Sequence, residues 1–193
     1  MRQRVSRTLS DSELILRSLE HPDDFVAIFD RHSAAIHAFL VRRAGRQRAE
    51  DILGDVWLQA FRSRSSYNAD WSDARPWLYG IARNTLRTHW RRSRRTFNIP
   101  PDESNDPWTV IDGQLDAVAE ADLLRHAIAE LTAADREVLL LAAWEDLSPS
   151  EIAIMLGVPP GTVRWRLHRA RSALQRAAGS KTSITRIAAT EGA

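Results

Sequence analysis

The segment 147–175 places the strictest limit on how this chain can fold. Ser148 suits the N-cap of a helix, Pro149 suits its first position, and Glu151 completes a capping box. Gly157 can adopt the left-handed backbone conformation that ends such a helix. The segment therefore begins with a short helix closed by a glycine. Its expected buried side chains are Ile152, Ala153 and Leu156.

A second helix is predicted after Pro159 and Pro160, because proline cannot continue the first helix and restarts the chain at a new angle. Apolar side chains that recur every three or four residues form its inward stripe: Val163, Leu167, Ala170 and Leu174. Its other faces carry hydrogen-bond donors and positive charge: Thr162, Arg164, Trp165, Arg166, His168, Arg169, Arg171 and Arg176.

Together these features are typical of a DNA-binding helix-turn-helix. The second helix of that motif must be narrow and rich in donors to read base edges in the major groove, and positively charged to lie beside phosphates. No acidic residue occurs between Ile152 and Thr190, which agrees with this interpretation. The alternative is an ordinary helical hairpin whose basic face is simply solvated.

The rest of the chain indicates an all-α fold. Apolar residues recur at helical spacing, and strand-like alternation is weak. The 193 residues suffice for one large domain or two small ones. Cysteine is absent, which excludes disulfides and thiolate zinc sites and suits a cytoplasmic protein. No apolar run approaches the roughly 20 residues of a membrane helix, so we expect no membrane insertion.

Charge is distributed unevenly along the chain, although the net charge is only +2. Residues 1–95 carry 18 Arg and 11 acids, whereas residues 96–118 carry five acids and no base. Residues 119–151 carry eight acids and two Arg, and residues 152–193 carry seven bases and one acid. Two basic blocks separated by acidic ones predict two contacts with a polyanion such as nucleic acid.

These blocks divide the chain into two small helical domains joined by a flexible acidic linker, and the C-terminal domain contains the helix-turn-helix. The linker is rich in proline and acid, a composition typical of inter-domain segments. The expected parts are a flexible arm (1–12), a first domain (13–95), the linker (96–117), a second domain (118–177) and a disordered tail (178–193).

In the first domain, a helix is expected to start near Asp23 and Asp24 and to end at Gly45. Its predicted core residues are Phe25, Ile28, Phe29, Ile36, Phe39 and Leu40.

The next predicted helix, residues 49–62, has two different sides. Its apolar stripe comprises Ile52, Leu53, Val56, Trp57, Ala60 and Phe61. Asp51 and Asp55 stand one turn apart on another face, either solvated or available to a basic partner. A catalytic or metal role would need a histidine or a second carboxylate pair placed to join them, and none is found.

The sequence as a whole has no histidine pair at metal-binding spacing, no nucleophilic constellation and no phosphate-binding glycine loop. We therefore expect no enzyme activity and no catalytic residue. We also expect no metal and no cofactor.

The second basic element is the predicted helix 75–95, which follows a polar, aromatic loop at 63–74. Arg83, Arg87 and Arg91 recur every four residues, and Asn84 lies beside them. Arginines at this density repel one another unless an anion is present. Aromatic side chains next to a basic stripe can also stack on unpaired bases.

Three segments now resemble bacterial extracytoplasmic-function sigma factors of the sigma-70 family. Residues 49–61 resemble the helix that docks on the coiled coil of the RNA polymerase β′ subunit. Residues 75–84 resemble the segment that melts and reads the minus-10 promoter element, and residues 161–171 resemble the helix that reads the minus-35 element. The resemblance implies a non-enzymatic initiation factor whose partners are core RNA polymerase (β′ and β subunits), promoter DNA and an anti-sigma factor, with no small-molecule substrate.

The resemblance also implies roles for individual residues. The polymerase-binding face would include Asp51, Asp55 and Trp57. The melted minus-10 strand would meet Asn68, Trp77, Arg83, Asn84, Arg87 and Arg91. The minus-35 duplex would meet Pro159, Thr162, Arg164, Trp165, His168 and Arg169. Trp165 departs from the small serine often found there in the family, so its indole would either contact a thymine methyl or block the usual approach.

Two other classes of function compete with this interpretation. One is a stand-alone helix-turn-helix regulator whose first domain senses a signal. The other is a helical adaptor that uses the acidic and apolar face of residues 49–61. A regulator would bind an operator without polymerase, and an adaptor would show no salt-dependent affinity for DNA.

Overall fold

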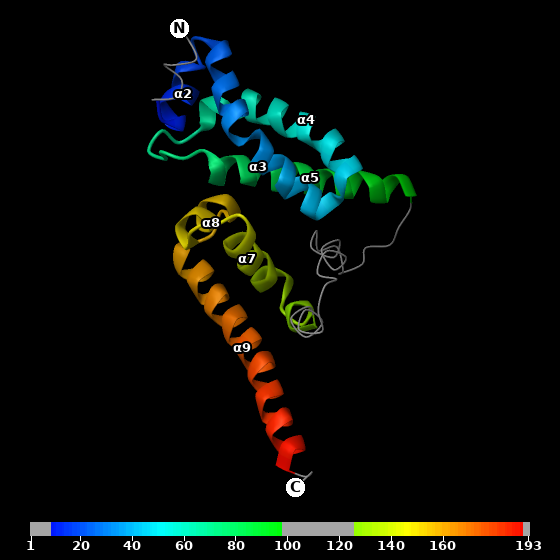
Figure 1. Cartoon of the computed structure of the whole chain (residues 1–193). Coiled ribbons are helices and arrows are strands. Elements are labelled where there is room, and N and C mark those ends of the chain that lie inside the picture. The colour runs from blue at the N-terminus through cyan, green and yellow to red at the C-terminus, as the bar shows by residue number, and fades with distance from the viewer. Residues whose placement is uncertain (1–8, 98–125, 191–193) are drawn as a thin grey trace. The chain divides into compact units, whose positions relative to one another are not determined.

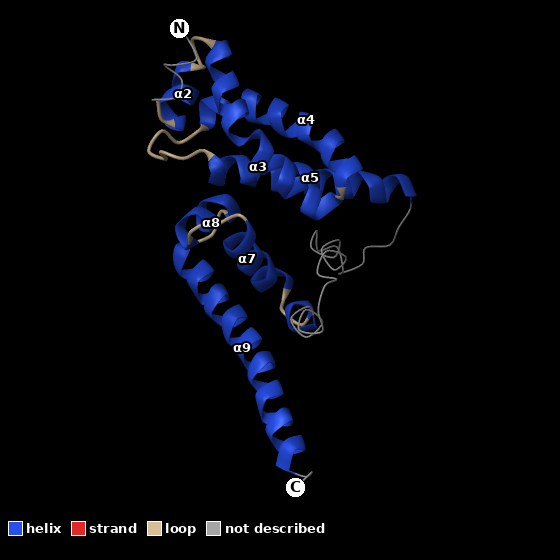
Figure 2. Cartoon of the chain, viewed as in Figure 1, coloured by secondary structure: helices blue, strands red, loops and turns tan. Residues whose placement is uncertain are grey.

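The structure is a computed structural model that describes residues 9–97 and 126–190. Within these ranges it is helical, with no strand (Figure 2). The chain divides into two compact units, Met1–Val110 and Ile111–Ala193. The predicted all-α class with two small helical domains is therefore confirmed. The predicted linker lies almost wholly outside the described residues.

Over its described residues, 9–97, the first unit has four α-helices and two short 3-10 turns: α2 (Asp11–Arg17), η1 (Pro22–Phe25), α3 (Val26–Ala44), α4 (Arg46–Ser63), η2 (Arg64–Ser66) and α5 (Arg75–Phe97). α3 packs against α4 and α5, and α4 packs against α5 (Figure 1). The side chains at the centre of this packing are almost completely buried: Ile28, Ile36, Phe39, Leu40, Ile52, Val56, Leu78 and Leu86.

A single residue, Gly45, joins α3 to α4. It ends α3 and begins α4 with φ 76°, a conformation that side-chain-bearing residues rarely adopt. The break predicted at this glycine is confirmed, and α4 begins at Arg46, slightly earlier than predicted. The direct joint fixes the direction of α4, and with it the side of the unit on which Asp51 and Asp55 lie.

Two expectations for the first unit were wrong. Residues 10–12, expected to belong to the flexible arm (1–12), form the N-cap and first turn of α2, which begins at Asp11 with Ser10 as N-cap and Glu13 closing a capping box. The next residue, Ser12, is buried, as Asp11 is. Phe29, expected in the core, is 42% exposed, because the inward face of α3 is formed by its other apolar residues.

The second unit contains a short helical stretch (126–129), α7 (Ala133–Trp144), α8 (Pro149–Leu156) and α9 (Pro160–Thr190). α7 and α8 pack against each other and against α9. Thr132 caps α7, since its side chain accepts a hydrogen bond from the N–H of Asp135. The core brings together residues of all three helices: Val138, Leu141, Ile152, Val163, Leu167 and Ala170.

The predicted helix-turn-helix is formed by α8 and α9. Ser148 and Glu151 make the predicted capping box, and Gly157 ends α8 in the left-handed conformation with φ 65° and ψ 38°. Ile152 and Ala153 are buried as predicted, whereas Leu156, also predicted to be buried, is only partly buried, and Met155 is buried beside it in α8. α9 continues to Thr190, so the tail expected to be disordered is helical over most of its length, since no proline interrupts it.

Among the described residues, no helix combines the length and the apolar character needed to cross a membrane.

Candidate nucleic-acid interfaces

The first turns of α9 present a polar and aromatic surface above a buried apolar stripe. Val163 and Leu167 are buried, while Arg164, Trp165 and His168 are exposed. Trp165 is a large apolar side chain, and yet 56% of its surface is exposed. Of the other predicted minus-35 residues, Pro159 is exposed and Thr162 is half-buried. These residues therefore share one accessible end of the helix.

Arg169 is engaged within the protein. Its Nε donates a hydrogen bond to Asp135 Oδ2 at 2.7 Å, and its Nη2 donates to the same oxygen and to Thr132 Oγ1 at 3.2 Å. The Asp135 side chain is only 2% exposed. The guanidinium carbon also lies 4.3 Å from the centre of the Trp165 ring. Arg169 thus joins α9 to α7 and supports the indole beside it, a role that the sequence did not reveal because Asp135 lies on another helix.

The predicted minus-10 residues of α5 differ in how far they are exposed to solvent. Asn84, Arg87 and Arg91 are exposed, and Arg83 is half-buried. Asn84 lines a polar groove of about 420 Å³ between α4 and α5. Arg62 and Arg92 line the same groove and outnumber its one carboxylate, Asp55, so the lining carries positive charge that suits an anionic strand.

The same groove brings one of the two α4 carboxylates, Asp55, next to α5. Asp55 lies in its lining and accepts a hydrogen bond from His89 Nε2 at 2.8 Å. Asp51, one turn earlier, is exposed. Trp57, predicted on or near the polymerase-binding face, is only 8% exposed and packs its ring against Phe25 and Phe29. It therefore supports α4 from within the core, because its helix turns it away from the side of the two carboxylates.

The loop 63–74 rests on a cluster of aromatic rings. Tyr67 makes edge-to-face contacts with Trp71 and with Trp77, at centroid distances of 5.8 and 5.2 Å. The Tyr67 hydroxyl also donates a hydrogen bond to the carbonyl oxygen of Trp71. Asn68 is exposed at the tip of the loop, and its Oδ1 accepts a hydrogen bond from the N–H of Asp70 at 3.0 Å. The loop is thus ordered and presents Asn68 outward.

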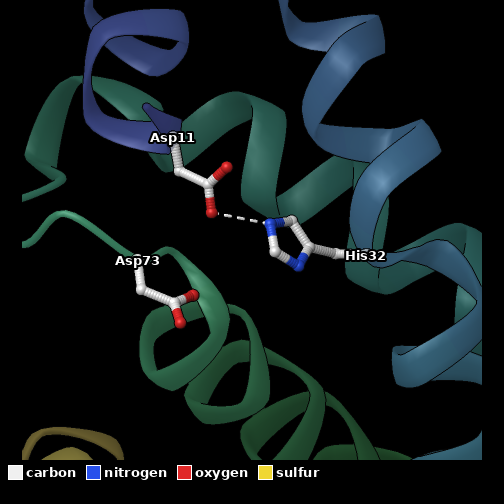
Figure 3. A group of neighbouring side chains, drawn as sticks. All are labelled: Asp11, His32 and Asp73. Atoms are coloured by element: carbon white, nitrogen blue, oxygen red, sulfur yellow. Dashed lines mark hydrogen bonds and ion pairs between the residues drawn. The ribbon is translucent and has the colours of Figure 1, made fainter. Parts of the chain in front are cut away.

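Sequence reasoning missed a cluster formed by Asp11, His32 and Asp73 (Figure 3). Asp11 Oδ2 accepts hydrogen bonds from His32 Nε2 at 2.7 Å and from the N–H of Ala74 at 3.0 Å, and Oδ1 accepts one from Arg31 Nη1 at 2.8 Å. The capping box at Ser10 was the local signal that could have revealed the helix carrying Asp11.

The cluster has three side chains of types that bind metals, with one potential ligand atom each within 4.8 Å of the others. A metal ion does not fit this arrangement, because both oxygens of Asp11 already accept hydrogen bonds and one comes from a cationic guanidinium. Asp73 similarly accepts hydrogen bonds from the backbone N–H and the Nε of Arg75. The cluster is a cross-link between α2, α3 and the start of α5.

The environment of Asp11 has a consequence for acid stability. Burial alone would raise the pKa of this carboxyl group, but hydrogen bonds from His32, from the N–H of Ala74 and from Arg31 lower the pKa to about 2. We therefore expect this carboxylate to stabilise the folded protein above its ordinary pKa near 3.8, and to lose that contribution, about 2 kcal/mol, as the pH falls toward 2.

Urea unfolding at a series of pH values, followed by NMR signals of α3 amides, measures this contribution. The free energy of unfolding of the first unit should exceed that of the Asp11→Asn variant by a constant amount above about pH 5, and the difference should shrink by about 2 kcal/mol at about pH 2. Parallel curves for the two proteins over this range would contradict a lowered pKa.

Comparison with known proteins accounts for both units. Residues 28–96 match the family described as Sigma-70 region 2, and residues 121–174 match Sigma-70, region 4. The ECF RNA polymerase sigma factor SigL of Mycobacterium tuberculosis is 32% identical over 152 residues, which cover 77% of this chain and 85% of SigL. The RNA polymerase sigma factor CarQ of Myxococcus xanthus is 32% identical over 161 residues, covering 81% of this chain and 90% of CarQ.

Solved structures share the fold. The sigma factor RpoE, in complex with the anti-sigma factor NepR from Bartonella quintana, has a TM-score of 0.55 and 23% identity, covering 81% of this chain and 97% of RpoE. CnrH, in complex with the cytosolic domain of CnrY, has a TM-score of 0.58 and 22% identity, covering 88% of this chain and 97% of CnrH. On the sequence matches, this chain belongs to the extracytoplasmic-function group of the sigma-70 family, and as a sigma factor it directs RNA polymerase to promoters without catalysing a reaction of its own.

Proposed function

We propose that the two units read two different parts of a promoter. The second unit reads the minus-35 element as duplex, with the first turns of α9 in the major groove. The observation that carries this assignment is the exposed face formed by Arg164, Trp165 and His168 directly above a buried stripe. A helix anchored in this way can enter a groove without exposing its own core.

The first unit takes the minus-10 element as a melted strand. The support is the ordered loop 63–74, which presents Asn68 outward above aromatic rings, together with the basic groove that Asn84 lines. Bases that have left the duplex can stack on aromatic side chains, and the strand's phosphates favour the arginines of α5. Each unit thus has the structure that its proposed target requires, because a rigid helix can enter the groove of a duplex and a loop can contact the bases of a single strand.

Polymerase docking is assigned to α4. Asp51 and Asp55 form an exposed acidic pair one turn apart, and such a pair suits a basic surface of the partner. The resemblance of residues 49–61 to the family's docking helix makes the coiled coil of the β′ subunit that surface, with the β subunit as a further contact of the bound factor.

An anti-sigma factor is a further proposed partner. RpoE, which has the same fold, forms a complex with the anti-sigma factor NepR. A protein that covers the polymerase-binding and DNA-binding faces of this chain would keep it inactive in the cytoplasm, the compartment we propose for it because core polymerase works there.

The minus-35 assignment predicts a specific effect of Arg164→Ala. We expect the variant to bind a minus-35 duplex roughly tenfold more weakly, because one exposed donor at the reading end of α9 is lost. Holoenzyme assembled with the variant should also lose run-off transcription from a promoter that depends on its minus-35 element.

Arg176→Ala is the matched control, since it removes the same charge from an exposed site three turns further along α9. It should lower affinity much less, and equally for specific and unrelated duplexes. Equal losses for the two variants would place the reading face elsewhere. A chain that bound operator DNA tightly but never supported initiation with core polymerase would instead act as a stand-alone regulator.

A further inference from the structure

The short helix α2 is hydrogen-bonded to the loop 63–74 at the beginning, the middle and the end of that loop. At the beginning, Arg64 Nε donates to the carbonyl oxygen of Ser18, which caps α2, at 3.3 Å. In the middle, Ser12 Oγ donates to the carbonyl oxygen of Ala69 at 2.7 Å. At the end, Asp11 Oδ2 accepts from the N–H of Ala74 at 3.0 Å.

The bond from Ala74 is buried and the other two are partly buried, so all three are shielded from water to some degree. Asp11 and Ser12 are 6% and 8% exposed, whereas Ala69 and its neighbours at the loop tip are exposed. A hydrogen bond whose partners are shielded from water costs more to break than an exposed one, because the groups left behind lose their solvation. The hydroxyl of Ser12 thus holds a carbonyl in the otherwise open part of the loop.

Asp11 is itself fixed from a second direction. His32 of α3 hydrogen-bonds to its carboxylate (Figure 3). Arg31 of the same helix donates a second hydrogen bond to it. The N–H of Ala74, where the loop ends directly before α5, is thereby connected through Asp11 to the packed helices of the first unit. The contacts that the loop makes within itself, such as Asn68 with Asp70, are short in sequence and do not set its position relative to α3.

We infer that α2 is a positioning element for promoter melting: Ser12 and Asp11 hold the loop 63–74 in its strand-binding conformation before DNA arrives. This inference rests on the proposed capture of the minus-10 strand by the loop. A loop that is already ordered loses less conformational entropy on binding, so the captured strand is held more tightly. Neither Ser12 nor Asp11 needs to touch DNA for this effect.

The central variant is Ser12→Ala in the full-length chain. It removes one hydroxyl and leaves the carbonyl of Ala69 without its bond from α2. We expect holoenzyme containing this variant to bind a single-stranded minus-10 oligonucleotide roughly fivefold more weakly, while its affinity for core polymerase stays unchanged. Ser12→Thr keeps the hydroxyl and should restore strand binding. A purely structural role would weaken both affinities together, so the split between them is the informative result.

A second variant and a second measurement test the same inference without relying on DNA. Asp11→Asn loses the charge that accepts from His32 and Arg31, and should weaken strand binding by roughly tenfold. Hydrogen exchange in the free protein should speed up at amides of residues 67–74 in both variants. Arg17→Ala, which removes an exposed ion pair with Asp24 from the same helix, is the control and should change neither quantity.

Asn68→Ala separates failure of this inference from failure of the proposed function. If Asn68→Ala weakens strand binding while Ser12→Ala leaves both strand binding and exchange unchanged, α2 does not position the loop. If Asn68→Ala has no effect on strand binding but Ser12→Ala speeds exchange, α2 orders the loop and the assigned role of the loop in strand capture is wrong.

Discussion

Arg169→Ala is expected to lower the free energy of unfolding of the second unit by about 3 kcal/mol. The arginine is the counter-ion of Asp135, whose side chain is 2% exposed and whose Oδ1 is buried without a hydrogen-bond partner. Removing the guanidinium leaves a buried carboxylate uncompensated, and such losses rank among the largest single-residue effects. Chemical unfolding followed through NMR signals of α8 amides measures this change.

A double-mutant cycle tests whether the effect comes from the ion pair. Asp135→Ala with Arg169→Ala should cost clearly less than the sum of the two single changes, with a coupling of more than about 1 kcal/mol. Arg176→Ala, an exposed arginine of the same helix, should change stability by less than about 0.5 kcal/mol. If Arg169→Ala left the stability unchanged and weakened only minus-35 binding, then Arg169 would read DNA as its sequence position predicted.

Asp51→Arg is expected to weaken binding of the chain to core polymerase by roughly 30-fold or more. The carboxylate is exposed on α4, so its charge can be reversed without disturbing the core of the first unit. Asp55 is the less suitable target, because it also accepts a hydrogen bond from His89 of α5. The expected loss reflects one favourable contact replaced by a repulsive one against a basic surface.

Glu50→Arg is the matched control for this variant. It makes the same change of charge one residue earlier, about 100° round the helix from Asp51. Equilibrium binding to core polymerase at two salt concentrations, with the unfolding midpoint of each variant measured in parallel, distinguishes docking from folding. Similar affinities of the two variants would exclude Asp51 from the docking face, whereas a drop confined to Asp51→Arg supports it.

The sequence predicted helix boundaries well wherever the signal is local. Ser148, Glu151 and Gly157 specify α8 through the contacts of neighbouring residues, and all three behave as predicted. Gly45 ends α3 for the same reason. The start of α2 carried an equivalent local signal at Ser10, which the polar composition of the surrounding residues concealed.

Features that depend on contacts between distant residues were not predictable in this way. The periodicity of α4 placed Trp57 correctly on an apolar stripe. It did not predict how completely residues such as Phe29 of α3 would cover the indole. The partner of Arg169 lies on α7, and an exposed arginine on a reading helix looks the same in sequence whether or not a buried carboxylate holds it. The same applies to Asp11, whose partners lie on α3 and next to α5.

The one-residue joint at Gly45 has a consequence for how α4 is aimed. A Cβ added at this position would meet no atom within 4 Å, so the constraint on the residue is its backbone conformation and not crowding. Gly45 is also the single residue between the two helices. Inserting one residue here would swing Asp51 and Asp55 by about 100° about the helix axis and carry them away from their present side of the unit. The side of the unit on which the acidic pair lies therefore depends on the number of residues between the two helices, which is one.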